Sequence, residues 1–488
     1  MLLVILLSVL CAMSKYSASL GIFIGITETA FLGVVYLKKS LSKYLTYFLI
    51  IITTCLDTPL FVFGEGTDRL YSFTYLPIIH GYHIFLLLLL PLLKIFHFDN
   101  FKAFKKSLKQ FKELRKTLKY ITVIYFAGIV FFIITIIIDD NEAWRNLYFY
   151  LKVFKHQLFL YTCVLLLFLD FSYVFLQDAK FCEHFKDVLY SILLGICISG
   201  IFVYISGIES GFAEGTVLLL TQASFFSISL LILPYYEIGN TIFGMTISLC
   251  MAFVMTQKAS AFAGKWWLFV FLIVLVFISR VFDIRSRNLF AKLVGIMMIV
   301  MVLTTLFWGN KINNFYGHSG YKLEQVYSLL NFKENWYHLL PDSPKYRIEE
   351  FINILIEYYK KPYLSIFGKG IAGSIQHHWG TLDWVMNTSA FTEDEMSIGY
   401  YSYLHETINC LYLSSGALGL LFFIHEIKCF FQNFRKNPWC VIGIVWFVFF
   451  AFSSYLSLWI GAVCLIYGKV DTLRYRCEKE KNYECTLC

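Results

Sequence analysis

The sequence predicts an all-α, polytopic membrane protein with about 14 transmembrane helices (range 12–14) and one large loop outside the membrane. Three observations lead to this fold class. The hydrophobic fraction is 58% and the mean hydropathy is +0.65. Only 15% of the residues are charged, whereas a soluble globular chain has about 25%. Apolar runs of about 20 residues, long enough to cross a bilayer, follow one another along most of the chain.

The first predicted region is a transmembrane bundle over residues 1–308, with about 11 spans. Its opening apolar run, 2–13, lacks the basic start and cleavage site of a signal peptide, so we interpret it as a membrane segment. Residues 100–119 are rich in lysine, with Phe and Leu at three- and four-residue spacing. This pattern predicts an amphipathic basic helix on the cytosolic surface of the membrane. We interpret it as a topology anchor rather than a docking helix.

The second half is expected to hold a large extracytoplasmic loop (309–404), C-terminal transmembrane helices (405–468) and a cytosolic tail (469–488). Orientation follows from the preference of Lys and Arg for cytoplasmic loops. With the basic helix inside, the other basic turns also fall inside, and the long loop falls outside. Both termini are then cytoplasmic.

Several functions are not indicated. The formal net charge is +8, but the Lys and Arg lie in short loops between spans, so nucleic acid is not an expected partner. A CxxC pair ends the tail at Cys485 and Cys488, and without a partner pair it is a weak metal signal. His377 and His378 are adjacent but lack a carboxylate or cysteine at ligand spacing. We therefore expect neither a metal nor a cofactor.

The long loop contains an amphipathic helical pattern, YRIEEFINILIEYYKK, over 346–361. Arg347 falls in its first turn, where the helix dipole disfavours a cation. A substrate anion or a nearby carboxylate would explain an arginine at this position. The alternative is a salt bridge to Glu349 or Glu350.

A glycine-rich turn follows the predicted helix in KPYLSIFGKG. Pro362 should end the helix. Gly368 and Gly370 flank Lys369, and the backbone amides of such a turn can approach a phosphate. Most turns of this kind have no such role, so the motif alone is a weak signal.

The loop closes with YSYLHETINCLYLSSGALGL, in which His405 stands where the chain returns to the membrane. Imidazole has an ordinary pKa near 6.5 and can act as a general base. The alternative is an interfacial histidine that only contacts lipid headgroups. Glu406 would point about 100° away on a helix, so we do not expect it to act as the base.

Two lysines lie at the outer end of an earlier predicted span, in MTQKASAFAGKWW. Lysine is under-used on the outer side of membranes, so Lys258 and Lys265 are candidates to face a phosphorylated lipid. The alternative is that both are interfacial lysines whose ammonium groups reach the headgroups.

These features together resemble the Wzy-type polysaccharide polymerase and O-antigen ligase superfamily. Arg347 on a loop helix, Pro362 followed by the FGKG turn, and His405 at the membrane return carry the resemblance. Glu406 stands where the family usually has Asn, and Lys258 where it has Arg. The resemblance covers roughly residues 240–425; the first half of the chain shares only the hydropathy.

The resemblance implies a GT-C-like bundle in the bacterial cytoplasmic (inner) membrane. It implies a glycosyltransferase that joins undecaprenyl-pyrophosphate-linked oligosaccharide repeat units into O-antigen, capsule or exopolysaccharide, without metal or cofactor. His405 and Arg347 would be catalytic. Substrate-binding residues would be Lys258, Lys265, Gly368, Lys369, Gly370, Tyr403 and Glu406. A chain-length regulator and a flippase would be partners.

Three other classes compete with this reading. A ligase of the same superfamily, moving finished glycan to another acceptor, would use the same residues. A lipid-linked oligosaccharide flippase or transporter suits the number of spans, but it would not need one soluble loop of this size, and no inverted repeat is visible. A channel or structural protein would not need the arginine, the histidine and the FGKG turn together.

Overall fold

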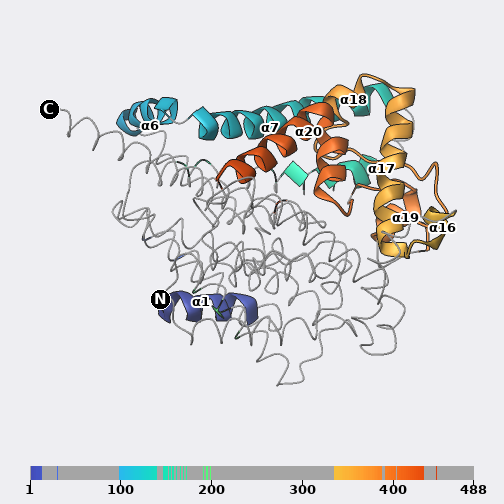
Figure 1. The fold of residues 1–488 in the computed structure, drawn as a ribbon, viewed down its shortest axis with the longest axis horizontal. Coiled ribbons are helices and arrows are strands. Elements are labelled where there is room, and N and C mark those ends of the chain that lie inside the picture. The colour runs from blue at the N-terminus through green and yellow to red at the C-terminus, as the bar shows by residue number, and fades with distance from the viewer. Residues whose placement is uncertain are drawn as a thin grey trace, which may run out of the picture. The chain divides into compact units, whose positions relative to one another are not determined.

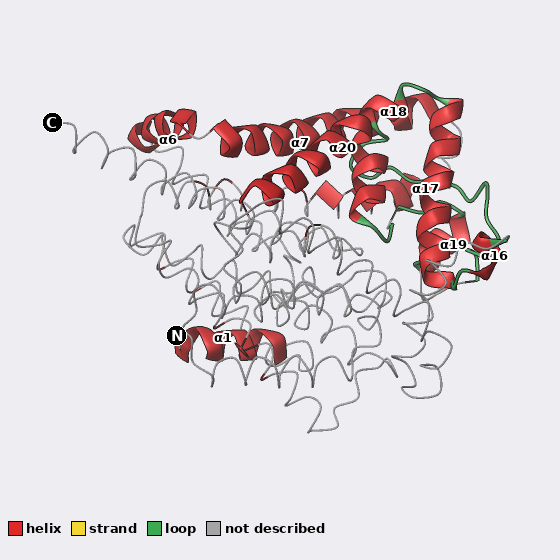
Figure 2. Cartoon of the chain, in the orientation of Figure 1, coloured by secondary structure: helices red, strands yellow, loops and turns green. Residues whose placement is uncertain are grey.

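The computed structural model describes residues 2–13, 98–110, 112–139, most of 147–154, 335–386, 391–402 and 404–433, with isolated positions elsewhere. These residues form helices and connecting turns, and among them β-pairing is limited to one isolated antiparallel bridge, Ile375 with Tyr401 (Figure 2). The helical class is therefore confirmed for the described part. Most of the predicted spans lie outside it, so the total of about 14 spans and the GT-C-like bundle stay predictions.

The chain divides into two compact units, Met1–Gly195 with Glu349–Cys488, and Ile196–Ile348. The first unit contains α1 (Leu2–Met13), α6, α7, most of α17, and α18 to α20. The second contains α16 (Trp336–Leu339) and the beginning of α17. The site described below lies within the first unit.

Two described helices are long and apolar enough to cross a membrane: residues 112–138 in α7 (Lys112–Asp139) and residues 407–432 in α20 (Thr407–Asn433). They pack against each other (Figure 1). The hydroxyl of Thr117, near the start of α7, donates to Glu426, near the end of α20, at 2.8 Å. The two helices are therefore antiparallel.

The predicted basic helix over 100–119 is divided between two helices in the structure. α6 (Phe98–Gln110) carries the first half, and α7 begins at Lys112 and continues into the apolar run without a break. Residues 112–139 contain no proline, and their one glycine, Gly128, does not interrupt the helix. The basic residues 112–119 are thus the first turns of the apolar helix.

One face of α7 leaves large apolar side chains exposed. They recur at three- and four-residue spacing, which places them on one stripe: Val123, Phe126, Val130, Ile133 and Ile137. Phe126 is 58% exposed and Ile137 is 62% exposed. A contiguous apolar stripe of this kind is unfavourable in water, and lipid would cover it.

α17 (Asp342–Lys360) begins four residues before the predicted start and ends two residues before Pro362. Proline at 344 falls in the first turn, where its missing amide proton breaks no hydrogen bond. Ile354 and Tyr358, four residues apart on one face of α17, are buried, whereas Leu355 is 41% exposed.

The glycine turn follows α18 (Leu364–Phe367) and fills a break in α20. α20 bends at Gly416, where φ is 55° and ψ is −140° (Figure 1). The amide of Lys369 donates to the carbonyl of Leu413 at 2.8 Å, and the amide of Gly370 donates to that of Ser414 at 3.1 Å. These bonds satisfy carbonyls that a straight helix would pair with its own amides.

The hydroxyl of Tyr358 also donates to this part of α20, to the carbonyls of Tyr412 at 2.8 Å and Leu413 at 2.9 Å. Burial, with Tyr412 and Glu357 nearby, raises the pKa of Tyr358 well above its usual value, so its hydroxyl keeps its proton. The break in α20 is therefore fixed from two elements, α17 and the turn after α18.

The turn lies wedged between α7 and α20. A Cβ at Gly368 would come 2.4 Å from the amide nitrogen of Ser415, and one at Gly370 would come 2.2 Å from that of Phe132. Both glycines also have positive φ, 73° and 87°. Glycine is thus required at both positions for steric and backbone reasons.

Candidate functional site

A buried carboxylate–histidine pair lies at the start of α20. His405 precedes α20 by two residues, and its Nδ1 hydrogen-bonds the carboxylate of Glu350 from α17. The backbone amide of His405 donates to the same carboxylate, at 3.0 Å from Oε2. Glu350 is 0% exposed and His405 is 7% exposed. An ionised carboxylate only accepts hydrogen bonds, so Nδ1 carries a proton and Nε2 is the basic nitrogen.

Asn409 completes this arrangement one turn into α20. Its side-chain amide donates to Oε2 of Glu350 at 3.0 Å. Three donors, two from His405 just before α20 and one from Asn409 in its first turn, therefore surround one carboxylate. The N-terminus of a helix favours negative charge, which helps to offset the cost of burying Glu350. This combination of carboxylate, imidazole and fixed tautomer is the arrangement that orients a general base.

The segment before His405 is held in place by α19 (Glu393–Ile398). A capping box joins Thr392 and Glu395 at the start of this helix. The buried carboxylate of Glu395 also accepts the amide of Ser402 at 2.6 Å. The ring of Phe391 meets the imidazole of His405 edge-on, with centroids 5.5 Å apart. His405 is therefore positioned by several independent contacts.

Other buried polar groups of α17 bind the loop after the glycine turn. Glu349 accepts the amide of Thr381 at 2.7 Å and the indole N–H of Trp384 at 2.8 Å. Asn353 accepts the amides of His378 and Trp379 at 2.7 and 2.8 Å. The polar residues of α17 thus organise the loop instead of facing solvent.

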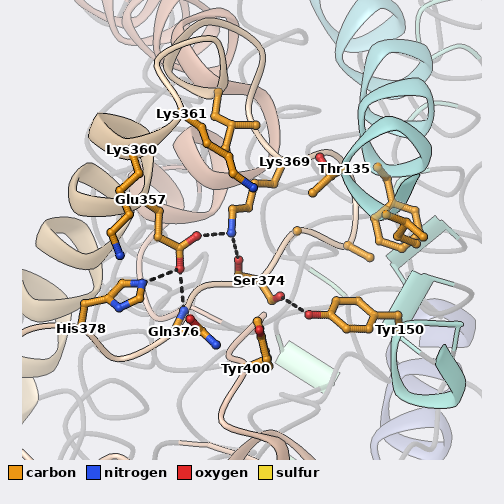
Figure 3. Close-up of a pocket in the computed structure, with 15 residues that line it drawn as sticks. Thr135, Tyr150, Glu357, Lys360, Lys361, Lys369, Ser374, Gln376, His378 and Tyr400 are labelled. Carbon is orange, nitrogen blue, oxygen red and sulfur yellow. Dashed lines mark hydrogen bonds and ion pairs between the residues drawn. The ribbon is translucent and has the colours of Figure 1, made fainter. Parts of the chain in front are cut away.

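A cavity of about 210 Å³ lies between α17, the loop and the C-terminal part of α7 (Figure 3). Phe132, Thr135 and Ile136 of α7 form one side of it. Most of the other lining residues are polar, among them Glu357, Lys360, Lys361, Lys369, Ser374, Gln376 and His378. Three lysines against one glutamate give the lining a formal charge of +3 − 1 = +2 with His378 neutral. Such a cavity favours an anionic ligand.

Glu357 is the centre of the polar network in this cavity (Figure 3). It forms an ion pair with Lys369, whose ammonium also donates to the carbonyl of Ser374 at 2.7 Å. Its other oxygen accepts the amide of Gln376 at 2.7 Å and lies 3.5 Å from Nε2 of His378. Lys369 is therefore fixed in the wall of the cavity.

Burial changes the acid–base behaviour of two groups in this wall. Partial burial, with Lys369 nearby, lowers the pKa of Lys361 from its usual value. Burial also lowers the pKa of His378, although Glu357 acts in the opposite direction. His378 is therefore neutral at pH 7, and the positive charge of the cavity comes from its lysines.

The carboxylate–histidine pair and the cavity are linked through α17. Glu350 and Glu357 are seven residues apart on this helix, which places them on one face and about 10.5 Å apart along its axis. The residue that holds His405 and the residue at the centre of the cavity network thus lie on one helix.

The structure describes some of the predicted site residues and not others. Lys258, Lys265 and Tyr403 lie outside the described residues. Arg347 lies in α17, three residues before Glu350, and belongs to the second unit. Glu406 directly precedes α20, and its carbonyl accepts the amide of Cys410 at 2.9 Å.

The predicted phosphate cradle at Gly368 and Gly370 needs correction. The amide of Gly368 donates to the carbonyl of Leu364, and the next two amides of the turn donate to α20. None of these three is available to a ligand, because each closes the turn or the break in α20. Lys369 instead places its ammonium group in the wall of the cavity, where it pairs with Glu357.

Sequence reasoning missed Glu350, Asn409 and the lysine pair Lys360–Lys361. One signal was readable: His405 and Asn409 have the spacing that places two side chains on one helical face. The carboxylates of α17 gave no such signal, because acidic residues in an amphipathic pattern ordinarily face water.

No protein-family profile, curated protein or solved structure matches this chain.

Proposed function

We propose that this chain is a polytopic glycosyltransferase of the bacterial cytoplasmic membrane. Its substrate would be an oligosaccharide repeat unit on undecaprenyl pyrophosphate, and it would join such units into a polysaccharide on the outer face. The observation that carries the proposal is the buried Glu350–His405 pair at the start of α20. The resemblance to Wzy-type polymerases adds the substrate class.

In this proposal His405 acts as the general base. Nε2 takes the proton of an acceptor sugar hydroxyl while its oxygen bonds to the anomeric carbon of the donor. The bond between that carbon and the phosphate oxygen breaks, and undecaprenyl pyrophosphate leaves. Glu350 holds the imidazole and stabilises its protonated form during transfer.

The cationic cavity would hold the pyrophosphate. Its lysines, Lys360, Lys361 and Lys369, would then lie where negative charge builds up as the bond to phosphate breaks, and such fixed charges would lower the barrier. With these lysines, the proposed transfer step would require neither a metal nor a nucleotide sugar. Arg347, Lys258 and Lys265 remain candidates for further contacts with the donor.

The membrane position follows from α7 and α20. The exposed apolar stripe of α7 suits contact with lipid, and its basic first turns suit the cytosolic side. The C-terminal part of α7 lines the cavity, and α20 begins beside His405. Both would therefore lie at the outer surface, where lipid-linked donors are presented. The remaining spans and cytoplasmic termini complete the proposed topology.

The test is reconstitution. The purified chain in liposomes should convert undecaprenyl-pyrophosphate-linked repeat units into longer glycans and release undecaprenyl pyrophosphate. Transfer of glycan to a different acceptor, with no chain growth, would identify a ligase. Movement of the donor across the bilayer without release of undecaprenyl pyrophosphate would identify a flippase and contradict the proposal.

A further inference from the structure

A second polar cluster lies at the opposite end of the α7–α20 pair. Glu113 comes from the first turn of α7, and His425 and Cys429 come from successive turns of α20. Sγ of Cys429 lies 3.8 Å from Oε2 of Glu113 and 3.8 Å from Nε2 of His425. The same Nε2 and Oε2 atoms are 3.9 Å apart. Three different donor atoms thus form a nearly equilateral triangle.

This triangle has the size of a metal site. An ion near its centre would lie about 2.2–2.4 Å from all three atoms, and zinc binds nitrogen, oxygen and sulfur at about 2.0–2.3 Å. Small side-chain adjustments of a few tenths of an ångström would close the difference. His425 and Cys429 are four residues apart on one helix, a spacing that directs two ligands to one ion.

A second carboxylate, that of Glu426, lies next to His425 outside the triangle. Oε1 of Glu426 lies 3.9 Å from Nε2 of His425 and accepts the hydroxyl of Thr117 at 2.8 Å. Glu426 is fully buried, and Thr117 is also buried. Two carboxylates and a thiol therefore surround one imidazole in an apolar helix pair. A dication would balance the charge that these groups carry when ionised.

We propose that Glu113, His425 and Cys429 bind one zinc-class divalent ion. A mixed set of imidazole, thiolate and carboxylate donors suits zinc better than magnesium or calcium, which prefer oxygen ligands alone. Binding would release the thiol proton of Cys429 and join the start of α7 to the end of α20. Its role would be structural, and it does not depend on the proposed glycosyl transfer.

The test measures metal in the intact protein. The full chain, purified in detergent with a tag that contains no histidine, is incubated with Zn²⁺, dialysed and analysed by mass spectrometry. We expect one zinc ion per chain. Replacement with Co²⁺ should give a thiolate-to-cobalt charge-transfer band and the visible bands of a tetrahedral site. Cys429→Ser should abolish the charge-transfer band, and Glu113→Gln should lower zinc retention.

Matched variants separate this site from other cysteines. Cys410→Ser changes a buried cysteine of the same helix outside the cluster and should keep the zinc. A variant with the three tail cysteines, Cys477, Cys485 and Cys488, replaced by Ser should keep it as well. The side chain of Glu113 is 48% exposed, so Glu113→Gln is the variant that tests a ligand without disturbing the core. Absence of zinc and of the cobalt band in the unmodified chain, or full retention in Cys429→Ser, would overturn the proposal.

Discussion

The backbone amide of His405 and the carboxylate of Glu350 are 3.0 Å apart, and the imidazole of the same histidine bonds the same carboxylate. One acidic residue of α17 therefore fixes both the backbone and the ring of the residue two positions before α20. This double contact makes Glu350 a positioning residue for His405 and gives the first prediction.

Glu350→Gln should reduce kcat by about 10²–10⁴-fold, the contribution of a general base, with little change in KM. The amide keeps the shape but loses the charge that stabilises protonated imidazole. The measurement is polymer formation against substrate concentration at equal protein amounts in liposomes. Glu393→Gln, at an exposed glutamate of α19, is the control and should match the unmodified protein. An unchanged kcat in Glu350→Gln would contradict the role of the pair.

Gly370→Ala should destabilise the fold by about 2–4 kcal/mol, because a side chain at positive φ is strained and its Cβ would overlap α7. The measurement is thermal unfolding in detergent. Gly399→Ala is the matched control: its φ is also positive, 76°, but nothing lies within 4 Å of the added Cβ. Gly399→Ala should lower the free energy of unfolding by only about 1 kcal/mol. Equal unfolding midpoints for the two variants would show that the turn is not wedged between helices.

The predictions from the sequence agree with the structure for helix ends and turns, which depend on the residue types at those positions. Pro362 and the FGKG glycines end α17 and make a tight turn as predicted, because proline lacks an amide proton and glycine accepts positive φ. The position of His405 before α20 also followed from the change from polar to apolar sequence. These features depend on residues close together along the chain.

The partners of these residues could not be predicted in the same way. Glu350 and His405 are 55 residues apart, and Cys429 and Glu113 are 316 apart. Nothing local distinguishes a carboxylate that is buried against a distant helix end from one that faces water. The sequence also predicts that the amides of the glycine turn bind a phosphate, whereas two of them bind carbonyls of α20. These carbonyls are open only because α20 breaks at Gly416, and the local sequence of the turn carries no sign of that break.

Replacing Lys360 and Lys361 by Gln together should weaken the binding of inorganic pyrophosphate by about ten-fold or more. Each lysine near a phosphate contributes about 1 kcal/mol at 4 Å in a water-like environment. Calorimetry on the purified chain measures the change. Lys105→Gln with Lys106→Gln, at two exposed lysines of α6, controls for net charge and should leave affinity unaltered. Equal losses in both double variants would mean that the cavity is not the anion site.

His378 should make the folded protein less stable as the pH falls. Burial lowers its pKa in the folded state below the usual value of 6.5, so the unfolded chain binds the proton more readily. This contribution to the free energy of unfolding is present above pH 6.5 and is lost as the pH falls below it. His378→Gln removes the titrating group. Thermal unfolding between pH 7 and pH 5 should therefore change less in the variant; an equal or larger change would contradict the assignment.

The most direct test of His405 as the general base is His405→Gln, which keeps hydrogen bonding but removes the base. The variant replaces the natural protein in its own host at equal membrane levels, and the length of the surface polysaccharide is compared with that made by cells carrying His338→Gln, at an exposed histidine of the same loop. We expect His405→Gln cells to make single repeat units without long polymer, and His338→Gln cells to make polymer of normal length. Normal polymer in His405→Gln cells would contradict the central claim.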